Sequence, residues 1–175
     1  MASLITLMGI IAVAVIFWQE RSLGVSVMPT TPQVSRLLMA ECPAQVRGDI
    51  LELGSGWGGM ALKLAHKYPQ NRVIGYEMSL LPYWISVIRS KLFSSGGNLK
   101  FVRKNFYNPS FNDAGLVMCY LSNPHMAKLE GKFLQELPSG AQVISSTFHC
   151  PNWQPLRTQD IVRLFNAQIF VYEKK

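Results

Sequence analysis

Short apolar runs alternate with longer segments of helical periodicity along most of this chain. Residues 114–121 (AGLVMCYL) form eight consecutive positions without a charge, a run typical of a central strand that is buried on both faces. Shorter apolar runs predict further strands, and segments with apolar residues three and four apart predict the helices between them. Strands that alternate with helices over about 120 residues predict a doubly wound, mostly parallel α/β sheet.

The expected elements follow one another in a regular order. A helix begins with Thr31 as its N-cap and Pro32 at its first position, and Pro43 ends it. Later helices are expected at residues 58–68, 82–94 and 125–137. The expected strands lie at residues 49–53, 72–77, 99–103, 114–121 and 141–148, followed by two closing strands at 161–165 and 168–172.

The N-terminal segment differs in composition from the rest of the chain. Residues 3–18 carry no charge and end in Phe17 and Trp18, an aromatic pair typical of a membrane–water boundary. A hydrocarbon core of roughly 30 Å needs about 20 residues, so this run is short for a span. A cleaved signal peptide is the alternative, but no positive charge precedes the run and no small-x-small site ends it. The expected organisation is a transmembrane anchor (1–20), a linker (21–29) and a domain (30–175).

Charge and cysteine content bear on the compartment and on the partners. The net charge is +7, and the apolar N-terminus favours a membrane surface over nucleic acid as the partner of that charge. Arg21 and Arg36 follow the apolar run, so the positive-inside rule predicts a domain on the cytoplasmic side of the membrane. The three cysteines are far apart, which argues for a reducing compartment and against a disulfide framework or a zinc site.

A glycine-rich turn directly follows the first expected strand. Gly54, Gly56 and Gly58 precede a helix, an order that lets the backbone and a helix N-terminus approach a bulky cofactor. About 20 residues later the second strand ends in Glu77, at the spacing where a carboxylate accepts hydrogen bonds from ribose hydroxyls. Together they predict a nucleotide-like cofactor across the first two strands. The alternative is a tight turn that binds nothing.

These residues resemble motif I of the class I S-adenosylmethionine methyltransferases, on the segment ELGSGWG at residues 52–58. Residues 28–175 are similar to a family of small, membrane-anchored protein-lysine methyltransferases with bacterial and mitochondrial members. The pattern Phe-x-x-Pro-x-Trp-x-Pro at residues 148–155 is the most specific match, since generic methyltransferases lack it. The chain departs from the family at residues 57–59, where Asp-Gly-Arg is common, and at Asn105, where an acid commonly follows the third strand.

The resemblance implies S-adenosylmethionine as the cofactor. The glycines would surround its amino-acid part, Glu77 would bind the ribose and Glu52 would support the methionine ammonium. The alternative for Glu52 is a carboxylate that caps backbone amides, and the alternative for Met78, expected beside the adenine, is core filling. Asn105 would hydrogen-bond the adenine amino group. The expected cofactor-binding residues are Glu52, Gly54, Ser55, Gly56, Gly58, Glu77, Met78 and Asn105, and no metal is expected.

Methylation of a lysine first requires a neutral amine, because an ammonium group has no lone pair. An aromatic channel of low polarity lowers the pKa of an amine by penalising its charged form. The residues expected at this channel follow the fourth and fifth strands, where α/β sheets bind ligands. His149 is a possible proton acceptor or an incidental loop residue, and Trp153 contacts the substrate or only packs. The expected catalytic residues are Tyr120, Asn123 and Trp153, with Phe148 beside them.

The sequence therefore predicts a single-pass, membrane-anchored methyltransferase, in a bacterial inner membrane, that modifies lysine in a neighbouring membrane protein. One alternative is a methyltransferase of a lipid or a membrane-soluble small molecule such as a quinone. Another is a non-catalytic membrane scaffold that retains a cofactor fold. A dehydrogenase is disfavoured, because its fingerprint Gly-x-Gly-x-x-Gly would need a glycine where this chain has Met60 or Ala61.

Overall fold

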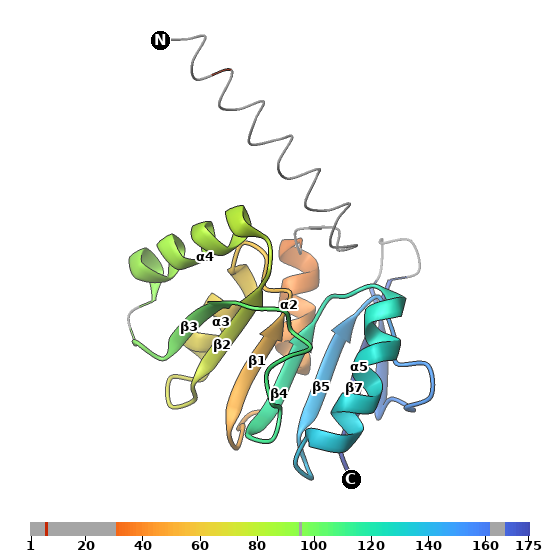
Figure 1. The fold of residues 1–175 in the computed structure, drawn as a ribbon. Helices are drawn as coiled ribbons and strands as arrows, with labels where there is room; N and C mark the ends of the chain where they lie inside the picture. Colours follow the sequence, from red (N-terminus) through yellow and green to blue (C-terminus); the bar gives the residue numbers. More distant parts are fainter. Residues whose placement is uncertain (1–5, 7–30, 95, 162–166) are drawn as a thin grey trace.

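The computed structural model describes Thr6 and residues 31–94, 96–161 and 167–175. Within these residues a seven-stranded sheet has the order β3-β2-β1-β4-β5-β7-β6 (Figure 1). Strands β1 to β5 are parallel, β7 is antiparallel to β5, and β6 is antiparallel to β7. The predicted doubly wound, mostly parallel sheet is confirmed.

The bounds of most elements agree with the sequence predictions to within a few residues. The helices are α2 (Pro32–Glu41), α3 (Gly59–Lys67), α4 (Leu80–Phe93) and α5 (Asn123–Glu136). The strands are β1 (Asp49–Leu53), β2 (Val73–Glu77), β3 (Leu99–Arg103), β4 (Ala114–Cys119), β5 (Gln142–Ser146), β6 (Arg157–Asp160) and β7 (Gln168–Glu173).

Local chemistry explains where the first helix begins. Thr31 has extended backbone and its hydroxyl oxygen accepts a hydrogen bond from the Val34 N–H at 3.3 Å, as an N-cap does. Pro32 follows at the first helical position, where a missing N–H has no effect on the helix ladder. The chain after α2 enters β1 at the amino edge of the parallel strands, so α2 begins near their carboxyl edge (Figure 1).

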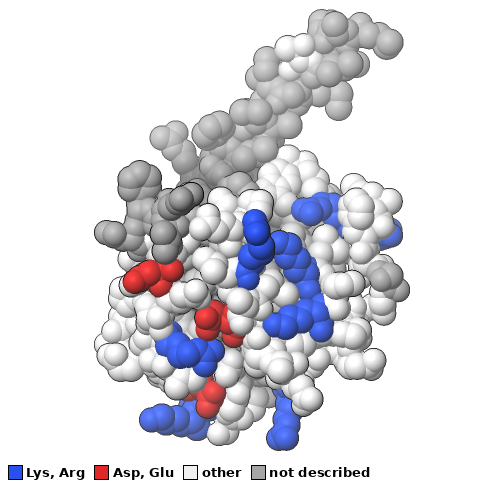
Figure 2. All heavy atoms as spheres, turned by 180° about the vertical axis from the view of Figure 1, so that it is seen from behind, with Lys and Arg blue, Asp and Glu red and all other residues white. Residues whose placement is uncertain are grey.

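Two apolar clusters cover the two faces of the sheet. Helices α2, α3 and α4 cover one face, where Leu38, Leu64 and Phe101 are buried. Helix α5 covers the other face, where Phe133 packs among the strands. Because the crossovers after β1 and β4 lie on opposite faces, their carboxyl ends form the switch point at which such sheets bind ligands. On the face seen in Figure 2, one group of Lys and Arg lies near the centre, and other basic side chains lie beside the acidic ones.

Three of the predicted segments have no counterpart among the described elements. The strand expected at 161–165 is wrong at Ile161, which lies outside any strand, and residues 162–166 are outside the described residues. The outer neighbour of β7 is instead β6, which lies at the sheet edge and whose sequence RTQD has no apolar residue. The expected anchor and linker, Thr6 apart, also fall outside the described residues. Of the helices that the structure describes, none is both long and apolar enough to cross a bilayer.

Candidate active site

The turn after β1 is held against β2 by backbone hydrogen bonds. The N–H groups of Gly54 and Ser55 both donate to the Tyr76 carbonyl oxygen, each at 2.9 Å. The Gly58 N–H donates to the Ser55 carbonyl oxygen at 2.8 Å and closes the turn. Gly54, Gly56 and Gly58 have φ angles of 74°, 50° and 76°, so all three take the left-handed conformation that favours glycine.

The glycines of the turn face different surroundings. A Cβ atom on Gly58 would lie 2.5 Å from Cζ of Phe101 and 2.8 Å from Cβ of Ser86, so this glycine permits close packing between α3, α4 and β3. A Cβ atom on Gly56 would meet no heavy atom within 4 Å. Gly58 therefore serves the packing of the protein, whereas Gly56 borders open space at the carboxyl end of β1.

Glu77 connects the second strand to the same turn. Its buried carboxylate accepts a hydrogen bond from the Gly56 N–H at Oε2 and another from the Ser79 N–H at Oε1, both at 2.7 Å. Two backbone donors thus fix the orientation of the carboxylate. Each carboxylate oxygen keeps a further lone pair, so the group can still accept hydrogen bonds from a diol. The structure thus brings Gly56 and Glu77, both expected at the cofactor, into direct contact.

Glu52 lies in β1 beneath the turn and is buried. Its Oε2 atom accepts a hydrogen bond from the Ala61 N–H in the first turn of α3 at 2.9 Å, which is the capping role. Burial raises the pKa of the Glu52 carboxyl to about 8, the bond from Ala61 opposes that rise, and the charge of Glu77 adds to it. A cationic ligand beside the pair would lower this pKa again. Capping and support of an ammonium group are therefore compatible roles.

The remaining expected cofactor residues are placed as follows. The Ser55 hydroxyl is buried and has no hydrogen-bond partner among the described residues, so the side chain faces the protein and only its backbone shapes the turn. Met78 is 38% exposed, so it is not core filling and is open to a planar ligand next to Glu77. Asn105 Oδ1 accepts a hydrogen bond from the Tyr107 N–H at 3.1 Å, which fixes the orientation of its amide. That oxygen keeps a second lone pair.

An aromatic pair stands at the carboxyl ends of β4 and β5. The rings of Tyr120 and Phe148 are stacked, with centroids 6.0 Å apart and an interplanar angle of 26°. The turn between β5 and Phe148 has an unusual backbone, because Thr147 has a φ angle of 69° and the Phe148 N–H donates to the Ser146 carbonyl oxygen at 2.8 Å. This is a γ-turn with positive φ, a rare and strained form. The Ser145 hydroxyl also donates to the Phe148 carbonyl oxygen at 2.6 Å.

Asn123 and Trp153 lie toward opposite ends of the strands. Asn123 is the first residue of α5 and is exposed just beyond β4, where it borders the same edge. The Trp153 ring lies 5.0 Å from that of Tyr172, which pairs with Val143 near the amino end of β5. It also lies 6.4 Å from the ring of Phe133, near the end of α5. Trp153 therefore packs toward the amino end of β5, away from the strand ends that carry Tyr120 and Phe148.

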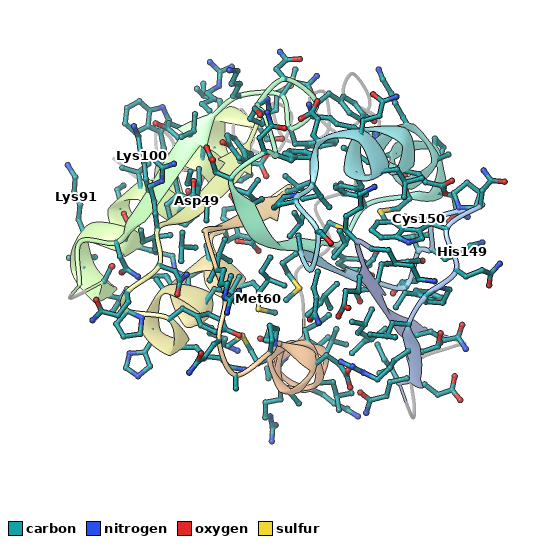
Figure 3. The ribbon with its side chains drawn as sticks, turned by 90° about the horizontal axis from the view of Figure 1, so that it is seen from below. Asp49, Met60, Lys91, Lys100, His149 and Cys150 are labelled. Carbon is teal, nitrogen blue, oxygen red and sulfur yellow. The ribbon has the colours of Figure 1, made fainter. Side chains whose placement is uncertain are left out.

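His149 belongs to the β7 side of the molecule. Its ring lies 5.7 Å from that of Phe170 in β7, and Figure 3 places it at the end opposite Lys91 and Lys100. The structure also shows a second histidine near the carboxyl edge, on the α5 side. His125 Nδ1 and the Tyr107 hydroxyl are 2.6 Å apart and hydrogen-bonded. Sequence reasoning missed this pair, because it joins a loop to the first turn of α5 across 18 positions.

A contact from α4 to the glycine turn was also missed. The Arg89 Nη1 atom donates to the Trp57 carbonyl oxygen at 2.7 Å. Members of the family often carry an arginine in the turn itself. In this chain an arginine from helix α4 contacts the turn instead. No periodicity or spacing signals such a contact, since 32 positions separate the two residues.

The strand order and the glycine turn facing an acid at the end of β2 define a Rossmann-like α/β fold with the cofactor turn of a methyltransferase. A solved RNA methyltransferase from Salinibacter ruber, in complex with S-adenosyl-L-homocysteine, superposes with a TM-score of 0.73 at 20% identity, covering 83% of this chain and 93% of that one. At that identity the likeness concerns the fold alone. The profile of the family described as the ANTKMT methyltransferase domain matches residues 52–157. The chain belongs to this family.

Curated relatives agree with that family. Over 111 residues the chain is 32% identical to the adenine nucleotide translocase lysine N-methyltransferase of Mus musculus, covering 62% of this chain and 47% of the relative. It is 22% identical over 149 residues to a protein-lysine N-methyltransferase of Saccharolobus islandicus, covering 83% and 91%. The chain spans about half the length of the mouse relatives it matches.

Proposed function

We propose that the protein is an S-adenosylmethionine-dependent methyltransferase that modifies lysine side chains of a membrane protein. The observation that carries the proposal is the Glu77 carboxylate, fixed by the Gly56 N–H at the rim of an open space that a Cβ on Gly56 would enter. Relatives of this chain are named as lysine N-methyltransferases, one of adenine nucleotide translocase and another of a component of ATP synthase.

The residues at the turn fit the proposed cofactor. Glu77 offers lone pairs for the ribose hydroxyls, and the exposed Met78 offers an apolar surface for the adenine. Glu52 is a buried acid whose raised pKa marks a place where a positive charge is favourable. The methionine ammonium supplies such a charge. Among the described residues no cluster of His, Cys, Asp or Glu is suited to hold a metal ion.

The protein's part in the reaction is to align the methyl donor with the lysine nitrogen and to exclude water. Bound S-adenosylmethionine would supply a methyl group on a cationic sulfur, and the lysine nitrogen would form the new N–C bond with its lone pair as the C–S bond breaks. Tyr120 and Phe148 would line the entry of the lysine, since aromatic surroundings lower an amine pKa and attract cations. Asn123 would border this entry from the start of α5.

The proposed location is a membrane, with a single anchor at residues 1–20 and the domain on the cytoplasmic side, in a bacterial inner membrane. The uncharged run of residues 3–18 and the arginines that follow it support the proposal. An anchor confines the enzyme to the bilayer surface, which raises its effective concentration near membrane-bound acceptors.

The test is methyl transfer from labelled S-adenosylmethionine to membranes of cells that lack the gene. The full chain should label a protein band, and mass spectrometry should place the methyl group on lysine. Glu77→Ala should abolish the label, while Trp153→Phe, which keeps an aromatic ring in the packing site, should retain it. Label confined to the lipid extract would establish the lipid or quinone alternative. Failure to bind the cofactor at all would establish a scaffold instead.

A further inference from the structure

The outward face of helix α4 is apolar. Leu80, Trp84, Ile88 and Leu92 are four residues apart and are 41%, 54%, 54% and 70% exposed. Positions four apart form one stripe on a helix, here about 18 Å long from the first to the last. Phe93 adds to the end of this stripe and is 71% exposed. We call these five residues the α4 stripe.

The inward face of α4 is largely apolar as well, so the helix is apolar on both faces. The residues of α4 that are buried are Pro82 and Ser86, with Tyr83 and Val87 partly buried against the core. A helix that meets water on one face normally buries its apolar side and exposes its polar side. Six of the eight large apolar side chains that are exposed in the described residues lie between Met78 and Phe93. The concentration marks an interaction surface rather than scattered surface residues.

The charge of the same region is positive. Residues 78–112 contain no Asp or Glu but carry five basic residues: Arg89, Lys91, Lys100, Arg103 and Lys104. Lys91 lies on α4 itself, at the edge of the molecule seen in Figure 3, and the Arg103 Nε atom donates to the carbonyl oxygen of Met78, just before α4, at 3.3 Å. Aliphatic residues with a tryptophan, flanked by lysine and arginine, fit the headgroup boundary of an anionic bilayer. A surface that binds nucleic acid would use the basic residues but would gain little from the exposed aliphatic residues.

The chain before α2 also favours a bilayer as the occupant. Only 12 residues, 19–30, separate the uncharged run of residues 3–18 from Thr31. Even fully extended they reach about 40 Å. Helix α2 begins at the same upper edge of the sheet at which α4 lies (Figure 1). A bilayer that holds residues 3–18 is therefore within reach of the α4 stripe.

We propose that the α4 stripe docks on the surface of an anionic lipid bilayer. This surface is separate from the proposed anchor and extends the proposed membrane location, on which it rests in part. Docking would have a consequence at the site, because α4 carries both Ser86, which packs beside Gly58, and Arg89, which bonds to Trp57. A bilayer-bound α4 would hold the cofactor turn and the acceptor entry close to lysines at the membrane surface.

The test places a polarity-sensitive fluorophore on the full chain. Ile88→Cys supplies an exposed thiol, whereas the three native cysteines are buried. Gln135→Cys, exposed on α5 at the other face of the sheet, is the matched control. The vesicles are phosphatidylcholine with and without phosphatidylglycerol, and some carry nitroxide groups on their acyl chains. Flotation measures vesicle binding of the whole chain independently.

If α4 docks, the emission of a fluorophore at position 88 should shift to the blue and be strongly quenched by the nitroxide groups. Both effects should be larger with phosphatidylglycerol, and a fluorophore at position 135 should show neither. Trp84→Ser with Leu92→Ser should reduce that quenching severalfold. Leu134→Ser with Leu156→Ser, which removes two exposed leucines elsewhere, should not change it. Chain that floats with vesicles while position 88 stays unquenched would overturn the inference and leave the membrane location intact.

Other occupants give distinct results. A blue shift without nitroxide quenching would mean that protein covers the stripe, and would overturn the inference. Dependence of that shift on protein concentration would identify a second copy of the chain, and independence would identify another segment of the same chain. Quenching at position 88 in a chain that shows no methyl transfer would support docking while the proposed activity fails.

Discussion

At the residue scale, Glu52 is a buried acid whose ionisation opposes folding. Burial raises its pKa from 4.5 to about 8, so the folded state holds this proton more tightly than the unfolded chain does. The stabilising contribution is therefore complete below pH 4.5 and is lost as the pH rises through 8.

Glu52→Gln tests that ionisation and keeps an oxygen for the Ala61 N–H. The variant should match the parent in stability at pH 4.5 and should exceed it above pH 8, by on the order of a few kcal/mol, because a neutral amide does not ionise. Thermal unfolding between these two pH values measures the difference. Parallel pH profiles for the two proteins would contradict the prediction.

Thr147 stores backbone strain next to the aromatic pair. A β-branched residue at positive φ costs about 1–3 kcal/mol, and glycine at the same position loses about 0.5–1 kcal/mol through chain entropy. Thr147→Gly should therefore raise the free energy of unfolding by roughly 1 kcal/mol. It should lower kcat severalfold, because Phe148 is then less firmly oriented toward Tyr120.

Thr147→Ala is the control, since it removes the side chain but keeps the need for positive φ. Its stability should stay within about 0.5 kcal/mol of the parent. If alanine stabilises as much as glycine, strain is not the cause and the side chain is. Unchanged kcat in the glycine variant would show that the turn does not position Phe148.

The sequence located those site residues that a strand and a turn place together. Gly56 and Glu77 meet because each ends or follows a strand, and neighbouring parallel strands end at one edge. Trp153 belongs to the pattern at residues 148–155, but that pattern does not show where its ring lies. The ring packs against Tyr172. Thr147 carried no signal at all, since a threonine gives no indication of positive φ.

At the scale of elements, the glycine turn combines two tasks that can be separated. Gly58→Ala places Cβ against Phe101 and Ser86 at positive φ, and should destabilise the protein by roughly 2–4 kcal/mol. Gly56→Ala meets no atom within 4 Å, so it should cost only about 1 kcal/mol, from its φ of 50°. Chemical denaturation of both variants measures these costs.

Cofactor affinity should rank the same two variants differently. Gly56→Ala projects a methyl group into the space proposed for the cofactor and should weaken S-adenosylhomocysteine binding at least as much as Gly58→Ala does. Isothermal titration calorimetry at a temperature where both variants are folded provides the comparison. Wild-type affinity in Gly56→Ala would place the cofactor elsewhere.

Element prediction succeeded where burial shaped the sequence. The eight-residue apolar run was expected as a buried strand, and its first six residues form β4, in the middle of the sheet. The polar β6 lies at an edge and pairs only with β7, so burial left no period-two pattern in RTQD. Hydrophobic periodicity cannot predict a strand that is held in the sheet by backbone hydrogen bonds alone.

At the scale of the whole molecule, a ligand that binds only the folded state must stabilise the entire domain. S-adenosylhomocysteine at 100 times its Kd should add about 2.7 kcal/mol, which corresponds to roughly 5–10 °C in Tm for a domain of this size. Differential scanning fluorimetry of the full chain measures the shift. Glu77→Ala should remove the shift, whereas Trp153→Phe should keep it; a parent chain that shows no shift would contradict the proposed cofactor.

The sequence by itself determined the doubly wound sheet, because burial restricts strand interiors to apolar residues. It also determined the glycine turn and the acid that faces it, because positive φ restricts the turn positions to glycine. Only the tertiary structure decided that Trp153 packs far from Phe148 and that Arg89 braces the turn. It also decided which side of α4, a helix that is apolar on both faces, stays exposed. A helix that is apolar all round does not reveal from its sequence which side remains exposed, because that depends on what the rest of the chain packs against it.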